Sequence, residues 1–219
     1  MSKVENPLNL SLDCLYRPSR RSEKAPLLIL LHGYGSNMHD LFSFAPYLNP
    51  DFAIVALQAP IPLGGPSHAW YSIYFDQPQG KWSDQQQARH AVNDLINIIE
   101  IIKKQLNVDE NKISLLGFSQ GAILSYAVAM TQKRIDKVVC LSGYLNPDIL
   151  PDDIALHACS YSKFFISHGT QDQVIPVDWA RNTKNTLLQL GCDLTYKEYP
   201  IGHGVSPDNF EALNHFLNT

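Results

Sequence analysis

A serine lies between two glycines in the stretch GFSQG, with Ser119 at its centre and Gly117 and Gly121 on either side. The apolar residues before it predict a buried strand, and those after it predict a helix. A sharp strand-to-helix turn lifts a serine hydroxyl away from a sheet, and such a turn has no room for side chains at the two glycine positions. The pattern therefore predicts that Ser119 is a nucleophile.

A nucleophilic serine needs a base, and the base needs an acid that orients it. Asp172 lies in SHGTQDQVIP after one predicted strand, and His203 lies in YPIGHGVSP after the next. Because open α/β sheets carry their sites at the carboxyl ends of strands, we expect both side chains near Ser119. The order serine, aspartate, histidine is that of α/β-hydrolases. Asp178 is an alternative acid, although its position suits a helix start.

Two backbone amides are candidates for binding an oxyanion. The stretch HGYGSN (32–37) follows an apolar run and forms a glycine-bearing turn that contains Tyr34. Gln120 begins the helix that follows the serine, and amide groups at a helix start attract negative charge. We expect the N–H groups of Tyr34 and Gln120 to form an oxyanion hole.

A long loop over residues 59–82 is rich in proline, glycine and aromatic residues. Loops of this length in compact domains are usually functional or disordered, and its aromatic residues argue against disorder. Because the loop follows the carboxyl end of a predicted strand, we expect Trp70 and Tyr71 to line the substrate site. The alternative is that both pack in the core of the loop.

The remaining histidines and the cysteines do not indicate a metal site. His32 and His168 each precede a glycine at a strand end, where hydrogen-bonded structural roles are expected. The other histidines show no ligand spacing; they are His39, His68, His90, His157 and His215. The cysteines Cys14, Cys140, Cys159 and Cys192 are far apart, without a C-x-x-C motif. We expect no metal, no cofactor and no disulfide framework, but reduced and mostly buried thiols.

Strand-like and helix-like segments alternate along the chain, which predicts an α/β fold with a mainly parallel sheet. We expect one domain over residues 1–219, with residues 1–24 as an N-terminal strand or edge region. The predicted strands are 26–33, 52–60, 112–117, 136–143, 163–169 and 192–200, and the predicted helices are 38–48, 83–106, 120–130, 177–190 and 207–218.

Composition limits the classes of partner. The chain has 219 residues, of which 45% are hydrophobic and 17% charged, as in ordinary globular proteins. Its net charge of −4 provides no general attraction to nucleic acid or anionic lipid. The amino terminus lacks the apolar core of a signal peptide, and the longest apolar run is far shorter than a membrane span. We therefore predict a soluble cytoplasmic protein without stable membrane insertion.

Four ordered motifs carry a resemblance to a known family. LHGYGSN, GFSQGA, SHGTQDQVIP and GHGVSP, with HAWYSI at 68–73, resemble the phospholipase/carboxylesterase family of α/β-hydrolases. This family includes bacterial carboxylesterases and acyl-protein thioesterases, which also act as lysophospholipases. The resemblance runs from about residue 25 to the end of the chain.

The resemblance implies a single-domain α/β-hydrolase whose sheet has helices on both faces. It implies a serine hydrolase without a cofactor, with Ser119, Asp172 and His203 as its triad and the amides of Tyr34 and Gln120 as its oxyanion hole. Two departures from the family pattern, Ser36 after H-G-x-G and Ala122 after G-F-S-Q-G, leave the substrate preference open.

The leading function is therefore hydrolysis of carboxylic esters or thioesters through an acyl-enzyme on Ser119. Expected substrates are small-molecule esters, lysolipids or acylated proteins. A serine peptidase on the same fold is one alternative, but the chain has no residues left for a selecting cap. A non-catalytic binding module is another, against which the intact serine, aspartate and histidine argue. Whether the protein forms a homodimer is left open by the sequence.

Overall fold

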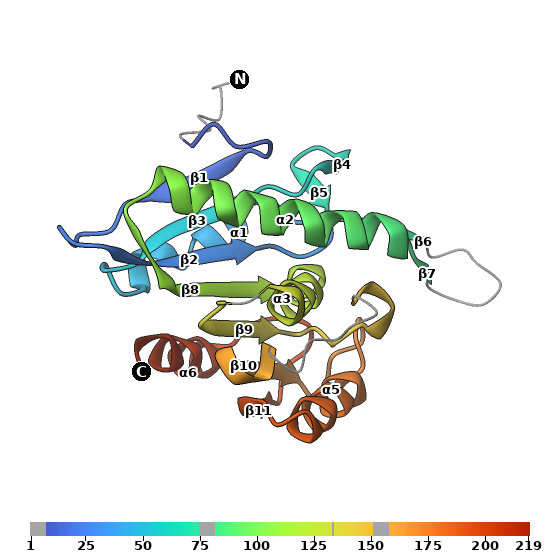
Figure 1. Ribbon diagram of the computed structural model, residues 1–219. Coiled ribbons are helices and arrows are strands. Elements are labelled where there is room, and N and C mark those ends of the chain that lie inside the picture. Colours follow the sequence, from blue (N-terminus) through green and yellow to red (C-terminus); the bar gives the residue numbers. More distant parts are fainter. Residues whose placement is uncertain (1–7, 75–81, 133, 151–157) are drawn as a thin grey trace.

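A seven-stranded sheet forms the centre of the computed structural model, which describes residues 8–74, 82–132, 134–150 and 158–219 (Figure 1). The strand order is β1-β3-β2-β8-β9-β10-β11. Only β1 at one edge runs antiparallel to its neighbour, and the other pairings in this sheet are parallel. The fold is thus of the α/β class, with a mainly parallel sheet.

The elements follow one another as the alternating pattern predicts, with short additions between β3 and α2. The strands are β1 (Cys14–Arg17), β2 (Ala25–Leu31), β3 (Ala53–Leu57), β4 (Ile61–Gly64), β5 (Ser67–Ala69), β6 (Ile73–Tyr74), β7 (Trp82–Ser83), β8 (Val108–Phe118), β9 (Lys137–Leu141), β10 (Lys163–Gly169) and β11 (Asp193–Tyr199). The helices are α1 (His39–Phe42), α2 (Gln85–Gln105), α3 (Gln120–Thr131), α4 (Ala158–Tyr161), α5 (Val177–Gln189) and α6 (Pro207–Asn218), with 3₁₀ turns at Ala45–Tyr47 and Pro147–Ile149.

Helices cover both faces of the sheet (Figure 1). On one face, buried residues of α2, α3 and α5 pack against alternate side chains of the strands, among them Ile29 of β2. On the other face, buried residues of α1 and α6 pack against the intervening side chains, among them Leu28 and Leu30. Because β2 is covered on both sides, its sequence is continuously apolar and not alternating. Within the described ranges, every helix is too short or too polar to span a lipid bilayer.

Two predicted segments differ from the structure. The predicted helix over 38–48 is the single turn α1 followed by a 3₁₀ turn that contains Pro46. Proline lacks the N–H that a continuing α-helix needs, so the helix breaks there. The aromatic loop contains a hairpin of β4 and β5 and a second short pair of β6 and β7. Residues 75–81 of that loop lie outside the described part of the chain.

The prediction of four separate thiols is wrong for one pair, because Cys159 and Cys192 are joined by a disulfide bond. These residues precede β10 and β11, which are parallel neighbours with Lys163 opposite Asp193. Parallel pairing thus brings together two cysteines that are 33 residues apart along the chain. Cys14 and Cys140 are buried and lie outside this disulfide, as expected.

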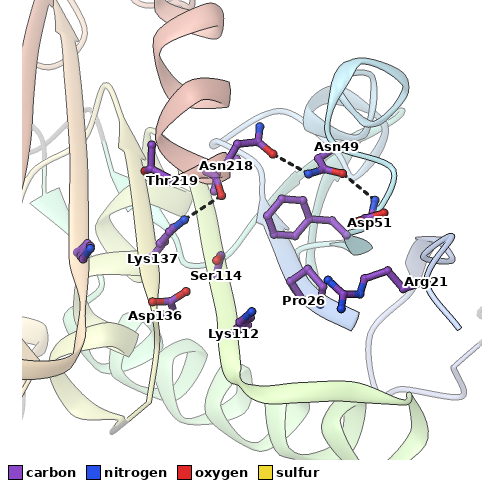
Figure 2. Close-up of a pocket in the computed structure, with 13 residues that line it drawn as sticks. Arg21, Pro26, Asn49, Asp51, Lys112, Ser114, Asp136, Lys137, Asn218 and Thr219 are labelled. Atoms are coloured by element: carbon purple, nitrogen blue, oxygen red, sulfur yellow. Dashed lines mark hydrogen bonds between the residues drawn. The ribbon is translucent and has the colours of Figure 1, made fainter. Parts of the chain in front are cut away.

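A pocket of about 320 Å³ lies at the amino-terminal edge of the sheet (Figure 2). Lys137, at the start of β9, donates to the carbonyl oxygen of Leu217 at 2.9 Å. This bond satisfies a carbonyl at the end of α6, where intrahelical partners run out. Asn49 donates to the side chain of Asn218 at 2.7 Å and fastens the same helix end. The pocket thus lies where α6 packs against the sheet edge.

Candidate active site

The turn between β8 and α3 has the strained backbone that the sequence predicts for Ser119. Its φ of 52° and ψ of −115° are rare for a residue with a side chain. A Cβ on Gly121 would collide with the backbone of Leu31, and one on Gly117 with the backbone of Gly121. The N–H of Ser119 donates to Leu141 at the end of β9 at 2.8 Å. The two glycines therefore let the turn sit directly on the sheet.

His203 links Ser119 and Asp172 in the structure. His203 Nε2 is 2.9 Å from Ser119 Oγ, and His203 Nδ1 is 2.7 Å from Asp172 Oδ2. In the tautomer that these partners favour, Nδ1–H donates to the carboxylate and Nε2 accepts from the hydroxyl. The arrangement allows the imidazole to take the serine proton while the carboxylate orients the ring.

Backbone pairing between two loops brings Asp172 and His203 together. Thr170 N–H donates to Tyr199 at 2.8 Å, and Gln171 N–H donates to Ile201 at 3.0 Å. The turn after β10 is therefore fastened to the turn after β11. The alternative acid, Asp178, is on α5, where its carboxylate binds Arg181 at 2.9 Å. The structure thus places Asp172, and not Asp178, against His203.

Hydrogen bonds keep the Asp172 carboxylate ionised. Oδ1 accepts from the N–H groups of Val174 at 2.8 Å and Ile175 at 2.9 Å. Burial by itself raises the pKa of a carboxyl group, but the bonds from His203, Ile175 and Val174 outweigh it. They hold the pKa of Asp172 below its ordinary value. A negative charge thus faces His203, which suits an imidazole that becomes positive during reaction.

The two expected amide donors lie at one pocket. Tyr34 and Gln120 both line the cavity that contains Ser119 and His203. The turn around Tyr34 is held by Gly35 N–H, which donates to His68 at 2.9 Å, and Gly35 has a φ of 76°. A left-handed conformation of this kind is readily adopted by glycine.

Trp70 does not line this pocket, so the prediction that it contacts substrate is corrected. Its side chain is buried, and its indole Nε1–H donates to the carbonyl oxygen of His32 at 2.9 Å. Trp70 therefore packs behind the turn that carries Tyr34. Tyr71, the other predicted residue, does line the pocket.

The side chain of Gln120 has a role that the sequence analysis missed. Its Oε1 accepts from Trp70 N–H at 2.9 Å, and its Nε2 donates to the carbonyl oxygen of Tyr71 at 2.8 Å. This buried amide thus holds the aromatic loop against the start of α3. An amide side chain next to a predicted nucleophile could have indicated a structural role for Gln120. Its partners could not be predicted, because Trp70 and Tyr71 are distant from it in sequence.

His32 and His168 are both buried and both bonded, as their positions predict. Burial is the main cause that lowers the pKa of His32 to about 4, so this imidazole is neutral. It accepts from the N–H of Ala59 at 3.1 Å. His168, in contrast, lies beside Asp172, with Nε2 3.2 Å from Oδ2. The sequence analysis did not predict this contact with the site.

The pocket around Ser119 has a volume of about 280 Å³ and is mainly apolar. Among the described residues its lining includes no lysine, arginine, aspartate or glutamate. Nor do the described residues contain a group of three histidine, cysteine or acidic side chains that could hold a metal ion. His157 lies outside the described ranges. The lining is formed by Tyr34, Tyr71, Ile73, Ser83, Ser119, Gln120, Ile123, Tyr144, Val174, Ile175, Trp179 and His203.

Comparison with known proteins shows which sequences and folds this chain resembles. A model of the phospholipase/carboxylesterase family matches residues 17–219. Esterase YpfH of Escherichia coli is 28% identical over 202 residues, covering 88% of this chain and 82% of its own length. Acyl-protein thioesterase 1 of Candida albicans is 26% identical over 242 residues, covering 95% and 97%. The crystal structure of esterase PE8 superimposes with a TM-score of 0.81 at 24% identity, covering 94% of this chain and 98% of that one.

Proposed function

Because this chain belongs to the phospholipase/carboxylesterase family, it is a hydrolase of esters or thioesters, and we propose that Ser119, His203 and Asp172 are its catalytic triad. The observation that carries this proposal is the continuous hydrogen-bonded chain from Ser119 Oγ through the His203 ring to Asp172 Oδ2, at 2.9 and 2.7 Å. Ser119 lies at a strained strand-to-helix turn, as expected for a nucleophile.

The reaction proceeds in two steps. Ser119 Oγ attacks the substrate carbonyl carbon while His203 Nε2 takes the hydroxyl proton, and the carbonyl oxygen becomes an oxyanion bound by the N–H groups of Tyr34 and Gln120. Collapse expels the alcohol or thiol, which receives the proton from His203. Water then attacks the acyl-enzyme with His203 again as base, which releases the acid and restores Ser119. Asp172 holds the ring in the required tautomer throughout.

The lining of the pocket selects an uncharged acyl chain. Tyr71, Ile73, Tyr144 and Trp179 offer apolar surface beside Ser119, and no charged side chain of the described lining could bind an anionic chain end. Each buried methylene group contributes about 0.8 kcal/mol. Acyl chains that fill the pocket are therefore preferred over acetyl.

The mouth of the pocket is open, which suits a large leaving group. Val174 and Trp179 line the pocket and also remain 52% and 45% exposed. A substrate can place its acyl chain against them while the alcohol or thiol stays in solvent. Lysolipids and acylated proteins, as well as small esters, are therefore compatible substrates.

Covalent labelling and a substrate panel test this function. The native protein should react with a fluorophosphonate probe and hydrolyse some members of a panel of p-nitrophenyl esters, lysophospholipids and acyl-thioesters. Ser119→Ala should abolish labelling and lower kcat by about 10⁴-fold to 10⁶-fold. Ser83→Ala, which changes another serine of the same pocket, should label normally. Undiminished labelling of Ser119→Ala would show that a different residue is the nucleophile.

A further inference from the structure

We propose that His168 is a positioning residue for this reaction, which fixes the turn that carries Asp172 and directs its Nε2–H toward the Asp172 carboxylate. This inference rests on the proposed function, because it assigns to His168 a role that acts through the triad. A residue with a packing role would only fill space. His168 would instead orient the Asp172 carboxylate through one ring nitrogen, Nε2.

The first observation is the position of His168 Nε2 between two acceptors. Its N–H donates to the carbonyl oxygen of Ile175 at 2.8 Å, and the same nitrogen is 3.2 Å from Asp172 Oδ2. Both side chains are fully shielded from solvent. An N–H dipole this close to a buried carboxylate interacts with it strongly, because little water screens it.

The second observation is the state of the other ring nitrogen. His168 Nδ1 is buried and has no hydrogen-bond partner among the described residues. Nε2 is therefore the ring nitrogen through which His168 contacts its polar neighbours. Because a carbonyl oxygen can only accept, the bond to Ile175 requires a proton on Nε2. His168 therefore acts as a fixed donor and not as a second base.

The third observation is that the bond to Ile175 closes a ring around the acid. Ile175 N–H donates to Asp172 Oδ1 at 2.9 Å, while Ile175 carbonyl accepts from His168. His168 thus fixes the peptide that holds one carboxylate oxygen, and lies beside the other oxygen, which accepts from His203. Loss of the His168 donor would leave the Ile175 carbonyl unpaired and let the turn rotate. The Asp172 carboxylate would then lose its alignment with His203.

The charged residue opposite His168 in β11 and two charged residues of α5 bind one another. Glu198 is the residue opposite His168 in β11, and it binds Arg181 of α5 at 2.7 Å. Asp178 binds the same guanidinium. A change at His168 therefore reaches the reaction through its contacts with Asp172 and Ile175.

Three variants test the proposal. His168→Leu removes the donor, and His168→Gln keeps an amide N–H at about the position of Nε2. Ser167→Ala is the matched control, because Ser167 is the adjacent buried residue of β10 and its hydroxyl has no partner among the described residues. Each variant is first checked by thermal unfolding and by the fraction that a fluorophosphonate labels at saturation.

His168→Leu should lower kcat by about 10-fold to 100-fold, the order expected for a displaced catalytic group, with KM nearly unchanged. The acid limb of its pH–rate profile should move to higher pH, since a carboxylate without this N–H favours the protonated imidazole more strongly. His168→Gln should restore most of both properties, and Ser167→Ala should match the native enzyme.

An acid limb that stays in place in His168→Leu, or a His168→Gln variant as impaired as His168→Leu, would overturn the proposal. If His168→Leu fails to fold, His168→Gln is compared with Ser167→Ala. Native kinetics in His168→Gln would support the donor role, and a kcat well below that of Ser167→Ala would overturn it. Failure of the proposed function looks different. In that case Ser119→Ala would retain the native rate, whatever the His168 variants do.

Discussion

Asp172 is the residue whose two oxygens connect two separate segments of the site. One oxygen binds the amides of Val174 and Ile175, and the other binds His203. Because an amide is nearly the same size as a carboxyl group, Asp172→Asn should fold, but it presents the wrong partner to His203. We expect kcat to fall about 10⁴-fold in a steady-state assay.

Asp178→Asn is the control for that experiment. Asp178 lies on the exposed side of α5 and binds Arg181, so its loss should leave kcat nearly unchanged. If Asp178→Asn lowered kcat strongly and Asp172→Asn did not, Asp172 would not be the acid that orients His203.

Trp179 replaces Trp70 as the aromatic wall of the pocket. Trp179 packs edge-on against Tyr144, with ring centroids 4.7 Å apart, and both line the cavity. In native enzyme, kcat/KM should rise with acyl length until the pocket is filled. Trp179→Ala should flatten that rise in a series of p-nitrophenyl esters and leave acetyl hydrolysis largely intact.

Trp70→Phe provides the contrast. It removes the indole bond to the carbonyl oxygen of His32 and should lower the free energy of unfolding by about 1 kcal/mol. Its dependence on acyl length should match that of native enzyme. If Trp70→Phe changed the dependence of kcat/KM on acyl length and Trp179→Ala did not, Trp70 would be the residue that contacts the acyl chain.

At the scale of elements, an ion-pair network joins α5 to the edge strand β11. Arg181 binds Glu198 through two bonds, at 2.8 and 2.7 Å, and Tyr196 donates to the same carboxylate. The bond from Arg181 is the largest cause that lowers the pKa of Glu198 to about 2, from an ordinary value of 4.5. The edge strand is thus held by charge as well as by backbone pairing with β10.

This shift predicts how acid affects stability. A carboxyl whose pKa is lower in the folded state stabilises the fold above its ordinary pKa, and the contribution is lost as pH falls toward the folded value. Glu198→Gln should therefore be less stable than native protein at neutral pH. In chemical unfolding experiments, the difference should shrink as pH falls from about 4.5 to about 2. Glu211→Gln, at an exposed position on α6, is the control that removes a carboxylate outside this network.

At the scale of the whole molecule, the Cys159–Cys192 bond connects the amino-terminal ends of β10 and β11. Protein unfolded without reductant should expose only the two thiols of Cys14 and Cys140 to a thiol reagent, and reduction should raise the number to four. Cys192→Ser should lower the free energy of unfolding by about 2–4 kcal/mol, as for other native disulfides.

A double variant separates the bond from the packing of each cysteine. Cys159→Ser and Cys192→Ser remove the same bond, so their combination should cost little more than either alone. Four reactive thiols in the unfolded, unreduced protein would contradict the disulfide.

The three residues of the proposed triad and the order of the main elements could be predicted from the amino-acid pattern alone. Ser119 could be identified because GFSQG encodes a local turn, and the glycines and the flanking apolar runs are adjacent to it. Asp172 and His203 could be identified because parallel strands place their carboxyl ends at one edge. The structure has these three side chains within hydrogen-bonding distance of one another.

Which other side chains reach the site follows from the packing of distant segments and could not be predicted from the sequence. Trp70 is buried and binds the carbonyl oxygen of His32, while Trp179 lines the pocket and His168 lies against Asp172. The disulfide likewise depends on the register of β10 and β11. Local pattern predicts whether a segment is a strand, helix or turn, because neighbouring residues set backbone conformation. Which side chains meet depends on how distant segments pack together, and that packing leaves no periodic signal along the chain.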